Sequence, residues 1–368
     1  GRLPAAEAER IAGRIERLRD IARSLKWELL ENVRKVRELL AASGGAAGPQ
    51  VVQVFRDLNA VLNSIDRMEV RGRDSAGVSV LVVLSAAEFD RLNAELAGGG
   101  LAAELAARTA AEPLLNRGIG VRRDAGRVSL AFTYKIAREI GSLGDNIRFL
   151  RGQIAADALL HRAVGRPLEF HTINAHTRWA SVGAITEANC HPVDNRVVNG
   201  PAGERGVIHT CLNGDIDNFQ ELREALERSG RRIHAEVTTD TKIIPLQVEH
   251  HLRQGADVAE AFRRAVCDFK GSHAIAMHTD LAPGKLFLAQ RGSGQAIFVG
   301  IAPDHYMATS EAYGFIEETQ AFVKLDGESV VDGRNGKTQG QIVVLDQDAG
   351  GGVEGLLGMR YDGSPLAL

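Results

Sequence analysis

Apolar residues near the start of the chain recur alternately four and three positions apart, with charged residues between them. The series consists of Ile11, Ile15, Leu18, Ala22, Leu25 and Leu29. This spacing is a heptad seam, typical of a helical hairpin or a short coiled coil. We therefore expect helix over residues 5–42, ended by the glycine-rich segment 43–49. The charges beside the seam are typical of a solvated helix face, and the seam itself could mediate self-association into a homo-oligomer or cover an inserted subdomain.

The next part of the chain predicts two further kinds of segment. An amphipathic helix is expected from about residue 55 to Met68, followed by a buried strand over the valine-rich, almost wholly apolar run 78–84. Residues 86–116 and 135–162 are rich in alanine and leucine, which predicts helices.

From residue 169 onwards, short apolar strands alternate with helices. Strands are expected near residues 170–176, 206–212, 272–279, 284–290, 296–299, 321–325 and 341–345. Helices are expected near residues 218–229, 240–252, 257–267 and 310–317. Because this order does not follow a strict βαβ rhythm, the pattern predicts an α+β fold built in layers.

These segments suggest a chain of one principal domain with additions. We expect a helical hairpin or coiled-coil-like insertion at 1–48, the first part of the principal domain at 49–84, an inserted helical segment at 85–165, the main part at 166–348 and a glycine-rich linker or tail at 349–368.

Composition excludes several classes of function. A net charge of −3 over 368 residues gives no electrostatic reason to expect nucleic acid as a partner. No apolar run approaches the roughly 20 residues of a membrane span, so no membrane partner is expected. Three cysteines without paired spacing favour reduced thiols and a cytoplasmic location. The histidines match no compact ligand pattern, so neither a metal nor a cofactor is expected.

Four short motifs carry the candidate chemistry. They are Arg71-Gly-Arg-Asp-Ser-Ala-Gly77, His176-Thr-Arg-Trp179, Asn213-Gly214 and Thr239-Asp-Thr241. Each has an ordinary structural explanation by itself: a turn for an Asn-Gly pair, cation–π packing for Arg-Trp and an N-cap for Thr-Asp-Thr. Together they supply what the zwitterion glutamine needs. Arg178 can bind a carboxylate through two parallel hydrogen bonds, and Asp240 can pair with an ammonium group.

An oxyanion hole can be built from the same set. The side chain of Asn213 and the backbone N–H of Gly214 are suitable donors for a developing negative charge, and glycine permits close backbone approach to a ligand. Asn213 and Gly214 are therefore the candidate catalytic residues.

The motifs resemble those of class II glutamine amidotransferases, most closely the glutaminase domain of glucosamine-6-phosphate synthases. The resemblance extends over about residues 55–80 and 165–345, and weaker similarity includes Gly271-Ser-His-Ala-Ile-Ala276. It implies an N-terminal-nucleophile hydrolase fold, a four-layer αββα sandwich, here with inserted helical segments. It also implies that a cysteine at the mature N-terminus attacks glutamine, and that the ammonia passes to an acceptor domain, expected downstream in the same polypeptide, which aminates fructose 6-phosphate.

The same resemblance assigns the candidate site residues. Asn213 and Gly214 match the oxyanion hole, Arg178 the carboxylate-binding residue, Asp240 the ammonium-binding residue, and Trp179 a residue that helps to gate the ammonia path. The remaining candidates for substrate binding are Ser181, His191, Thr241 and Arg71.

Three departures from the family pattern affect this assignment. No cysteine precedes Cys190, so the nucleophile is missing from the 368 residues. Val182 stands where the family commonly has a histidine, and the long helical segments are insertions relative to the compact domain. Cys190 and Cys211 are poor substitutes as nucleophiles because neither has a free α-amine and burial raises the pKa of a thiol.

The leading hypothesis is therefore a domain that hydrolyses glutamine to glutamate and ammonia, with a nucleophilic cysteine outside the given residues. The alternative is a catalytically silent amidotransferase-like module that binds an amino acid or serves in assembly. A third hypothesis is another N-terminal-nucleophile amide hydrolase without a synthase partner.

Overall fold

The computed structural model describes residues 4–43, 47–110, 114–138, 142–198, 206–328 and 340–368. The helices are α1 (Ala5–Arg23), α2 (Leu30–Leu39), α3 (Pro49–Met68), α4 (Ala86–Gly98), α5 (Ala102–Thr109), α6 (Asp145–Ala156), α7 (Ala158–Val164), α8 (Phe219–Arg228), α9 (Ile243–Arg253) and α10 (Val258–Asp268). The strands are β1 (Ser75–Ser85), β2 (Ile119–Asp124), β3 (Arg127–Ala137), β4 (Leu168–Arg178), β5 (Ile208–Gly214), β6 (His273–Thr279), β7 (Lys285–Arg291), β8 (Phe298–Ile301), β9 (Tyr306–Thr309), β10 (Phe322–Lys324), β11 (Gln341–Asp346) and β12 (Leu356–Arg360).

The first sheet has the order β2-β3-β1-β4, and its described pairings are antiparallel. Alternate residues of β1, such as Val78 and Val80, point into an apolar core shared with α3, α4, α6 and α7. The other face of β1 is also buried, as Ser79 shows. A strand that is buried on both faces explains the continuous apolar run seen in the sequence.

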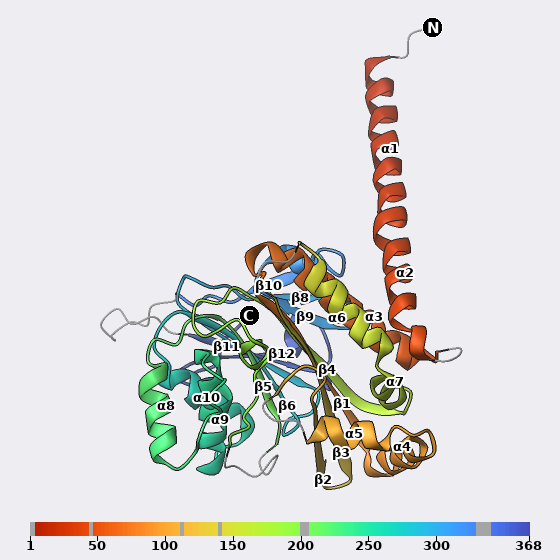
Figure 1. The fold of residues 1–368 in the computed structure, drawn as a ribbon. Coiled ribbons are helices and arrows are strands. Elements are labelled where there is room, and N and C mark those ends of the chain that lie inside the picture. The colour runs from red at the N-terminus through yellow and green to blue at the C-terminus, as the bar shows by residue number, and fades with distance from the viewer. Residues whose placement is uncertain (1–3, 44–46, 111–113, 139–141, 199–205, 329–339) are drawn as a thin grey trace.

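The second sheet has the order β12-β11-β7-β6-β5 and is likewise antiparallel. One face packs on α8, α9 and α10 through a second core that includes Leu212, Ile275 and Phe262. Its other face lies toward the first sheet, where Ser79 Oγ of β1 is 2.6 Å from Nδ1 of His209 in β5. The order of layers is thus helices, sheet, sheet, helices (Figure 1). The predicted α+β, four-layer αββα sandwich is confirmed.

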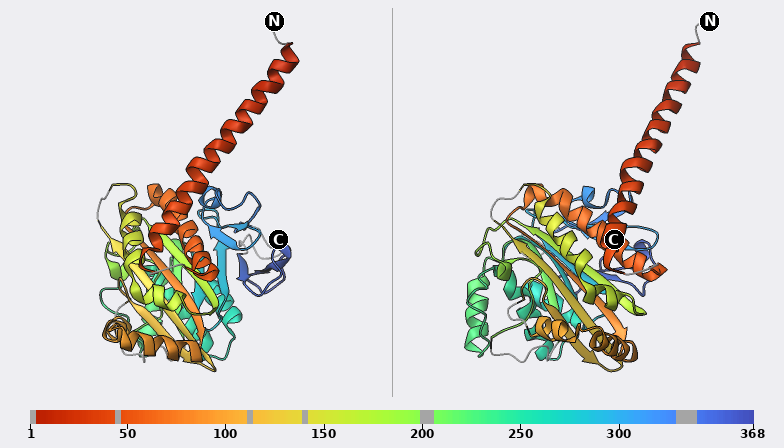
Figure 2. Two further views of the ribbon diagram at one scale, coloured as in Figure 1. Left: turned by 90° about the vertical axis from the view of Figure 1, so that its right-hand side faces the viewer. Right: turned by 45° about the vertical axis from the view of Figure 1, so that its right-hand side comes forward.

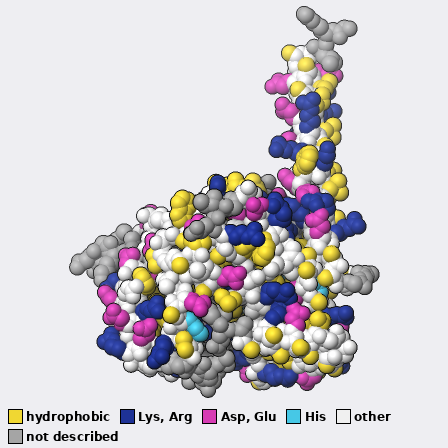
Figure 3. All heavy atoms as spheres, viewed as in Figure 1, with side chains coloured by type: hydrophobic (Ala, Val, Ile, Leu, Met, Phe, Trp, Pro, Cys, Tyr) yellow, Lys and Arg dark blue, Asp and Glu magenta, His cyan; other side chains and the backbone are white. Residues whose placement is uncertain are grey.

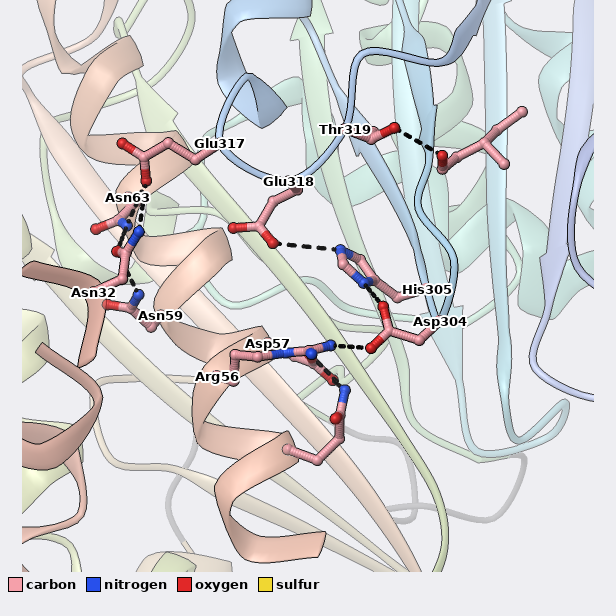
Figure 4. A network of polar contacts seen from close by, with 12 residues as sticks. Asn32, Arg56, Asp57, Asn59, Asn63, Asp304, His305, Glu317, Glu318 and Thr319 are labelled. Atoms are coloured by element: carbon pink, nitrogen blue, oxygen red, sulfur yellow. Dashed lines mark hydrogen bonds and ion pairs between the residues drawn. The ribbon is translucent and has the colours of Figure 1, made fainter. Parts of the chain in front are cut away.

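A small third sheet, β10-β8-β9, packs beside α3 through an apolar cluster that includes Ala60 and Met307 and through polar contacts (Figure 4). Arg56 on α3 forms an ion pair with Asp304 at 2.6 Å, and Asp304 is 2.8 Å from His305. Further along α3, Asn63 donates a hydrogen bond to Glu317. These contacts hold β9 beside α3, and both elements contribute to the cavity described below.

The N-terminal segment is not the predicted hairpin. Helices α1 and α2 are joined by a π-helical turn, Ser24–Leu29, and together they form one arm that projects from the body (Figures 1 and 2). Only the C-terminal end of the arm contacts the body, where Leu39 is buried in the core shared with α3. The chain turns after this residue, so α2 packs against α3 and not against α1.

The segment at 85–165, expected to be an inserted helical segment, contains strands as well as helices. Strands β2 and β3 form a hairpin within it, and β3 pairs with β1 along its whole length. The buried carboxylate of Asp157 ties this hairpin to the helices, because it accepts hydrogen bonds from Tyr134 of β3 at 2.6 Å and from Arg108 of α5. The hairpin is therefore an integral part of the first sheet.

Two shorter segments also differ from expectation. The tail at 349–368 is not a linker, because β12 pairs with β11 and Tyr361 is buried in the second core. The helix expected at 310–317 is a single 3-10 turn, Ala312–Phe315, preceded by the unpredicted strand β9. Among the described helices, none combines the length and apolar character needed to cross a bilayer.

Candidate functional site

A cavity of about 450 Å³ opens where β4 and β5 end. Its walls come from these strand ends, from the segment that follows β4, from residues 239–241 and from α3 and β9. The nine candidate residues of the sequence all line it: Arg71, Arg178, Trp179, Ser181, His191, Asn213, Gly214, Asp240 and Thr241. Segments that are far apart in the sequence thus converge on one cavity.

Arg178 is the last residue of β4, and its side chain is buried among backbone carbonyls. Its guanidinium donates hydrogen bonds to the carbonyl oxygens of Val182 and Ala184, which fold the following loop back over it. Burial lowers the pKa of Arg178 from its usual value, but a guanidinium remains charged. It forms no ion pair among the described residues, so its charge is available to an anionic ligand.

Asp240 begins the turn before α9 and is also buried. Its Oδ2 accepts a hydrogen bond from the N–H of Ile216 at 2.9 Å, while no cation within the described ranges pairs with it. Burial raises the pKa of the carboxyl above its usual range. A buried carboxylate of this kind gains strongly from an incoming ammonium group.

The carboxamide of Asn213 has a fixed orientation. His176 of β4 donates its Nε2–H to Asn213 Oδ1 at 2.7 Å, which leaves the Nδ2 donors of Asn213 without a described partner. Burial lowers the pKa of His176 to about 4, so the ring is neutral near pH 7. The geometry therefore makes Asn213 a donor toward the cavity, as an oxyanion hole requires.

Gly214 satisfies a steric requirement beside Asn213. Its φ of +87° lies in the left-handed region, and a Cβ there would be 2.2 Å from the carbonyl oxygen of Ser272. No other residue fits without moving the backbone. The glycine therefore sets the path of the chain at the end of β5.

Behind these groups the cavity wall is held by short polar contacts. Ser181 Oγ–H donates to Asp215 at 2.8 Å, and Thr241 Oγ1 is 2.8 Å from Nε2 of His191. The His191 ring lies 4.6 Å from that of His176, and burial lowers the pKa of His191 well below its usual value. Thr241 and the two histidine rings therefore support the wall with neutral groups.

Two candidates lie at the rim. Trp179 is 73% exposed, and the Arg71 guanidinium forms an ion pair with Glu311. Both line the cavity, but neither is enclosed by it. Their position suits access to the cavity better than tight binding within it.

The cysteines do not supply a reactive thiolate. Burial raises the pKa of Cys190 and raises that of Cys211 well above the usual value. Cys211 lines the cavity, whereas Cys267, the third, is a surface residue of α10. In the described part of the chain, no group of three histidine, cysteine, aspartate or glutamate residues is placed to hold a metal ion.

Sequence reasoning missed the positioning role of His176 and the hydrogen bond of Asp215. The signal for His176 was present, because residues two apart on a strand share a face and His176 precedes Arg178 by two. The walls from α3 and β9, which include Ile65 and Met307, carried no such signal because they depend on tertiary packing.

A known family of domains matches part of the chain. Residues 199–317 match the family model described as a glutamine amidotransferase domain. The chain thus carries a segment that matches a glutamine amidotransferase domain, and this segment contains Asn213, Gly214 and Asp240.

The curated relatives of the chain carry the name of a particular enzyme. The chain is 31% identical over 174 residues to the isomerizing glutamine–fructose-6-phosphate aminotransferase of Methanothermobacter thermautotrophicus, covering 47% of this chain and 25% of that protein. It is 30% identical over 290 residues to the enzyme of the same name from Streptomyces coelicolor, covering 78% of this chain and 34% of that protein. The chain thus spans about a quarter to a third of the length of these relatives.

Among solved structures, similarity extends to one titled as the allosteric regulatory enzyme of purine biosynthesis. The TM-score is 0.49 at 15% identity, covering 82% of this chain and 46% of that one. Because this score is low, the evidence for the family lies in the sequence matches.

Proposed function

We propose that this chain binds glutamine and forms the part of an enzyme that hydrolyses it to glutamate and ammonia, for transfer to a sugar phosphate such as fructose 6-phosphate. The observation that carries the proposal is the convergence of Arg178, Asp240 and Asn213 on one cavity. Arg178 would bind the α-carboxylate and Asp240 the α-ammonium group. Asn213 and Gly214 would donate to the oxyanion that forms as the amide is attacked.

The chemistry also needs a nucleophile. We propose that it is a cysteine thiol outside these 368 residues, because the buried Cys190 and Cys211 thiols are protonated near pH 7. The thiol would add to the amide carbon, ammonia would leave, and water would release glutamate from the thioester. The names of the relatives support a sugar phosphate as the ammonia acceptor.

Calorimetry with Arg178→Ala tests the binding site. Removing a buried, fixed charge should weaken glutamine binding at least tenfold, because the α-carboxylate loses its ion-paired hydrogen bonds. Arg91→Ala is the matched control: Arg91 is an exposed arginine on α4, away from the cavity, and its loss should leave the affinity unchanged. Equal glutamine affinity in Arg178→Ala and the parent chain would contradict the assignment.

A second candidate function is a catalytically silent module that binds an amino acid or serves in assembly. It is favoured by Val182, which stands where the resembled family commonly has a histidine. The protein expressed from its native start codon separates the two candidates. Release of glutamate from glutamine supports the enzyme, whereas glutamine binding without turnover supports the silent module.

A further inference from the structure

Surface charges offer a small zwitterionic ligand little selectivity. On the face shown in Figure 3, charged side chains of both signs are interspersed among the described residues, and water and salt screen such exposed charges. The buried carboxylate of Asp240 is screened much less, so its position has more influence on the binding of a charged ligand. Residues 231–239, which lead to Asp240, contain no helix or strand. The position of this carboxylate therefore depends on contacts from other segments.

Asn189 supplies such contacts through its side-chain amide, which is fully buried. Its Oδ1 accepts hydrogen bonds from the N–H groups of Thr238 at 2.7 Å and Thr239 at 2.9 Å. Its Nδ2 donates to the carbonyl oxygen of Glu236 at 3.1 Å and to Thr186 Oγ1 at 2.9 Å. The two backbone donors determine which end of the amide is the oxygen. Both polar atoms of this side chain are thus engaged in holding neighbouring segments together.

The two N–H groups that Asn189 binds belong to the residues directly before Asp240. The loop after β4 packs on the same backbone, because a Cβ at Gly183 would be 2.9 Å from the nitrogen of the second of these residues. His191 supports the residue after Asp240, since its Nε2 is 2.8 Å from Thr241 Oγ1. That contact reaches a side chain, whereas Asn189 binds the backbone. Of these contacts, that of Asn189 constrains the path of the chain into Asp240 most directly.

We propose that Asn189 is a positioning residue for Asp240 and that it thereby sets the affinity of the site for the α-ammonium group of an amino acid. The inference rests on the proposed function, which assigns that group to Asp240. Asn189 is outside the cavity lining, so it acts through the carboxylate and not by touching the ligand. Without Asn189 the N–H of the buried Thr239 loses its acceptor, and the backbone must shift to find another partner. The carboxylate shifts with it.

A double-mutant cycle tests the proposal, with calorimetric titration of the whole chain by glutamine. Asp240→Asn should weaken binding at least tenfold, because the ammonium group loses its countercharge. Asn189→Ala should weaken binding about tenfold, because the carboxylate is displaced. The double variant should bind as weakly as Asp240→Asn alone, since Asn189 acts through that carboxylate. If Asn189→Ala has no effect, or if the two losses multiply in the double variant, the inference is overturned.

Two further variants keep the result interpretable. Asn195→Ala is the matched control, because Asn195 also accepts a backbone N–H, from Ile208 at 3.1 Å, and donates to the carbonyl oxygen of Gly206 at 3.1 Å. These bonds lie at the opposite end of β5 from the site, so the glutamine affinity should be unchanged. Asn189→Ser, which keeps a small polar group, takes the place of Asn189→Ala in the cycle if the alanine variant does not fold.

A ligand without the ammonium group gives an independent readout. Glutaramate has the carboxylate and the side-chain amide of glutamine but no α-ammonium group. Its affinity, measured by competition with glutamine, should be the same in Asn189→Ala and the parent chain, while that of glutamine falls. An equal loss for both ligands would show a merely structural role and would overturn the inference. If Asp240→Asn leaves the glutamine affinity unchanged, the proposed function itself is contradicted, whatever Asn189→Ala does.

Discussion

At the scale of single residues, the candidate site contains two buried charged groups that have no countercharge among the described residues. Arg178 and Asp240 are both buried, yet neither forms an ion pair within the described residues. Keeping such groups buried and unpaired is costly for a folded protein. A ligand with the opposite pair of charges removes that cost, which is why a free amino acid suits this cavity.

His176 should act as a positioning residue for Asn213. His176→Ala would release the Asn213 carboxamide, so in the complete enzyme kcat should fall roughly tenfold to a hundredfold with little change in KM. His176→Gln retains a donor for Asn213 Oδ1 and should recover most of the rate. Steady-state kinetics of glutamate release measures both variants. A fall in thermal stability with no difference in kcat between the alanine and glutamine variants would show a purely structural role.

The identity of these residues could be predicted from sequence because each lies at the end of a strand or the start of a helix. Arg178, Asn213 and Asp240 stand in short motifs whose local structure is strongly determined. Their convergence could not be derived from periodicity, and the resemblance to a family supplied it. Contacts such as that of Ser181 with Asp215 depend on how two loops meet, for which one sequence gives no signal.

At the scale of elements, the amphipathic helices and the buried strand β1 were predicted from the sequence, whereas several other strands were missed. Helices α8, α9 and α10 each show an apolar face, and the predicted spans agree with the structure. Strand β3 was missed although apolar residues occupy every second position from Val128 to Ile136, which is the period of a strand. Strand β12 follows a run of glycines that suggests a linker.

The C-terminal strand should contribute to stability. Tyr361 is buried beside β12, and its hydroxyl lies 2.8 Å from Nε2 of His273. Tyr361→Ala should lower the free energy of unfolding by about 3–5 kcal/mol, and Tyr361→Phe by about 1 kcal/mol. Urea denaturation measures both, with Leu357→Ala on the exposed face of β12 as a control of near-zero effect. Equal stability of Tyr361→Ala and the parent chain would mean that the tail is dispensable, as a linker would be.

At the scale of the whole molecule, the layers enclose an unusual number of neutral histidines. Burial lowers the pKa of His176 to about 4 and those of His273 and His278 to about 3. The unfolded chain binds protons at these positions near pH 6.5, whereas the folded chain does not. Stability contributed by them is therefore complete above pH 6.5 and is lost as the pH falls toward the folded-state values.

Acidification should consequently destabilise the fold. Each of these histidines should lower the free energy of unfolding by about 2 kcal/mol at pH 5 relative to pH 7.5. Asp280 acts in the opposite sense, because burial raises its pKa to about 6. Its protonation on acidification stabilises the folded state by about 1 kcal/mol and offsets part of the loss from the histidines. Urea midpoints should fall between pH 7.5 and pH 5, and His278→Gln should make that fall smaller. Identical midpoints at the two pH values would contradict the assignment of neutral buried rings.

The positions of the tryptophans have a spectroscopic consequence. The chain contains two, Trp27 on the arm and Trp179 at the rim of the cavity, and both are more than half exposed. Replacing Trp27 with phenylalanine leaves a single fluorophore beside the candidate glutamine site, and replacing Trp179 leaves a single fluorophore on the arm. Emission from the two single-tryptophan variants can thus report on the cavity and on the arm separately, without an added label.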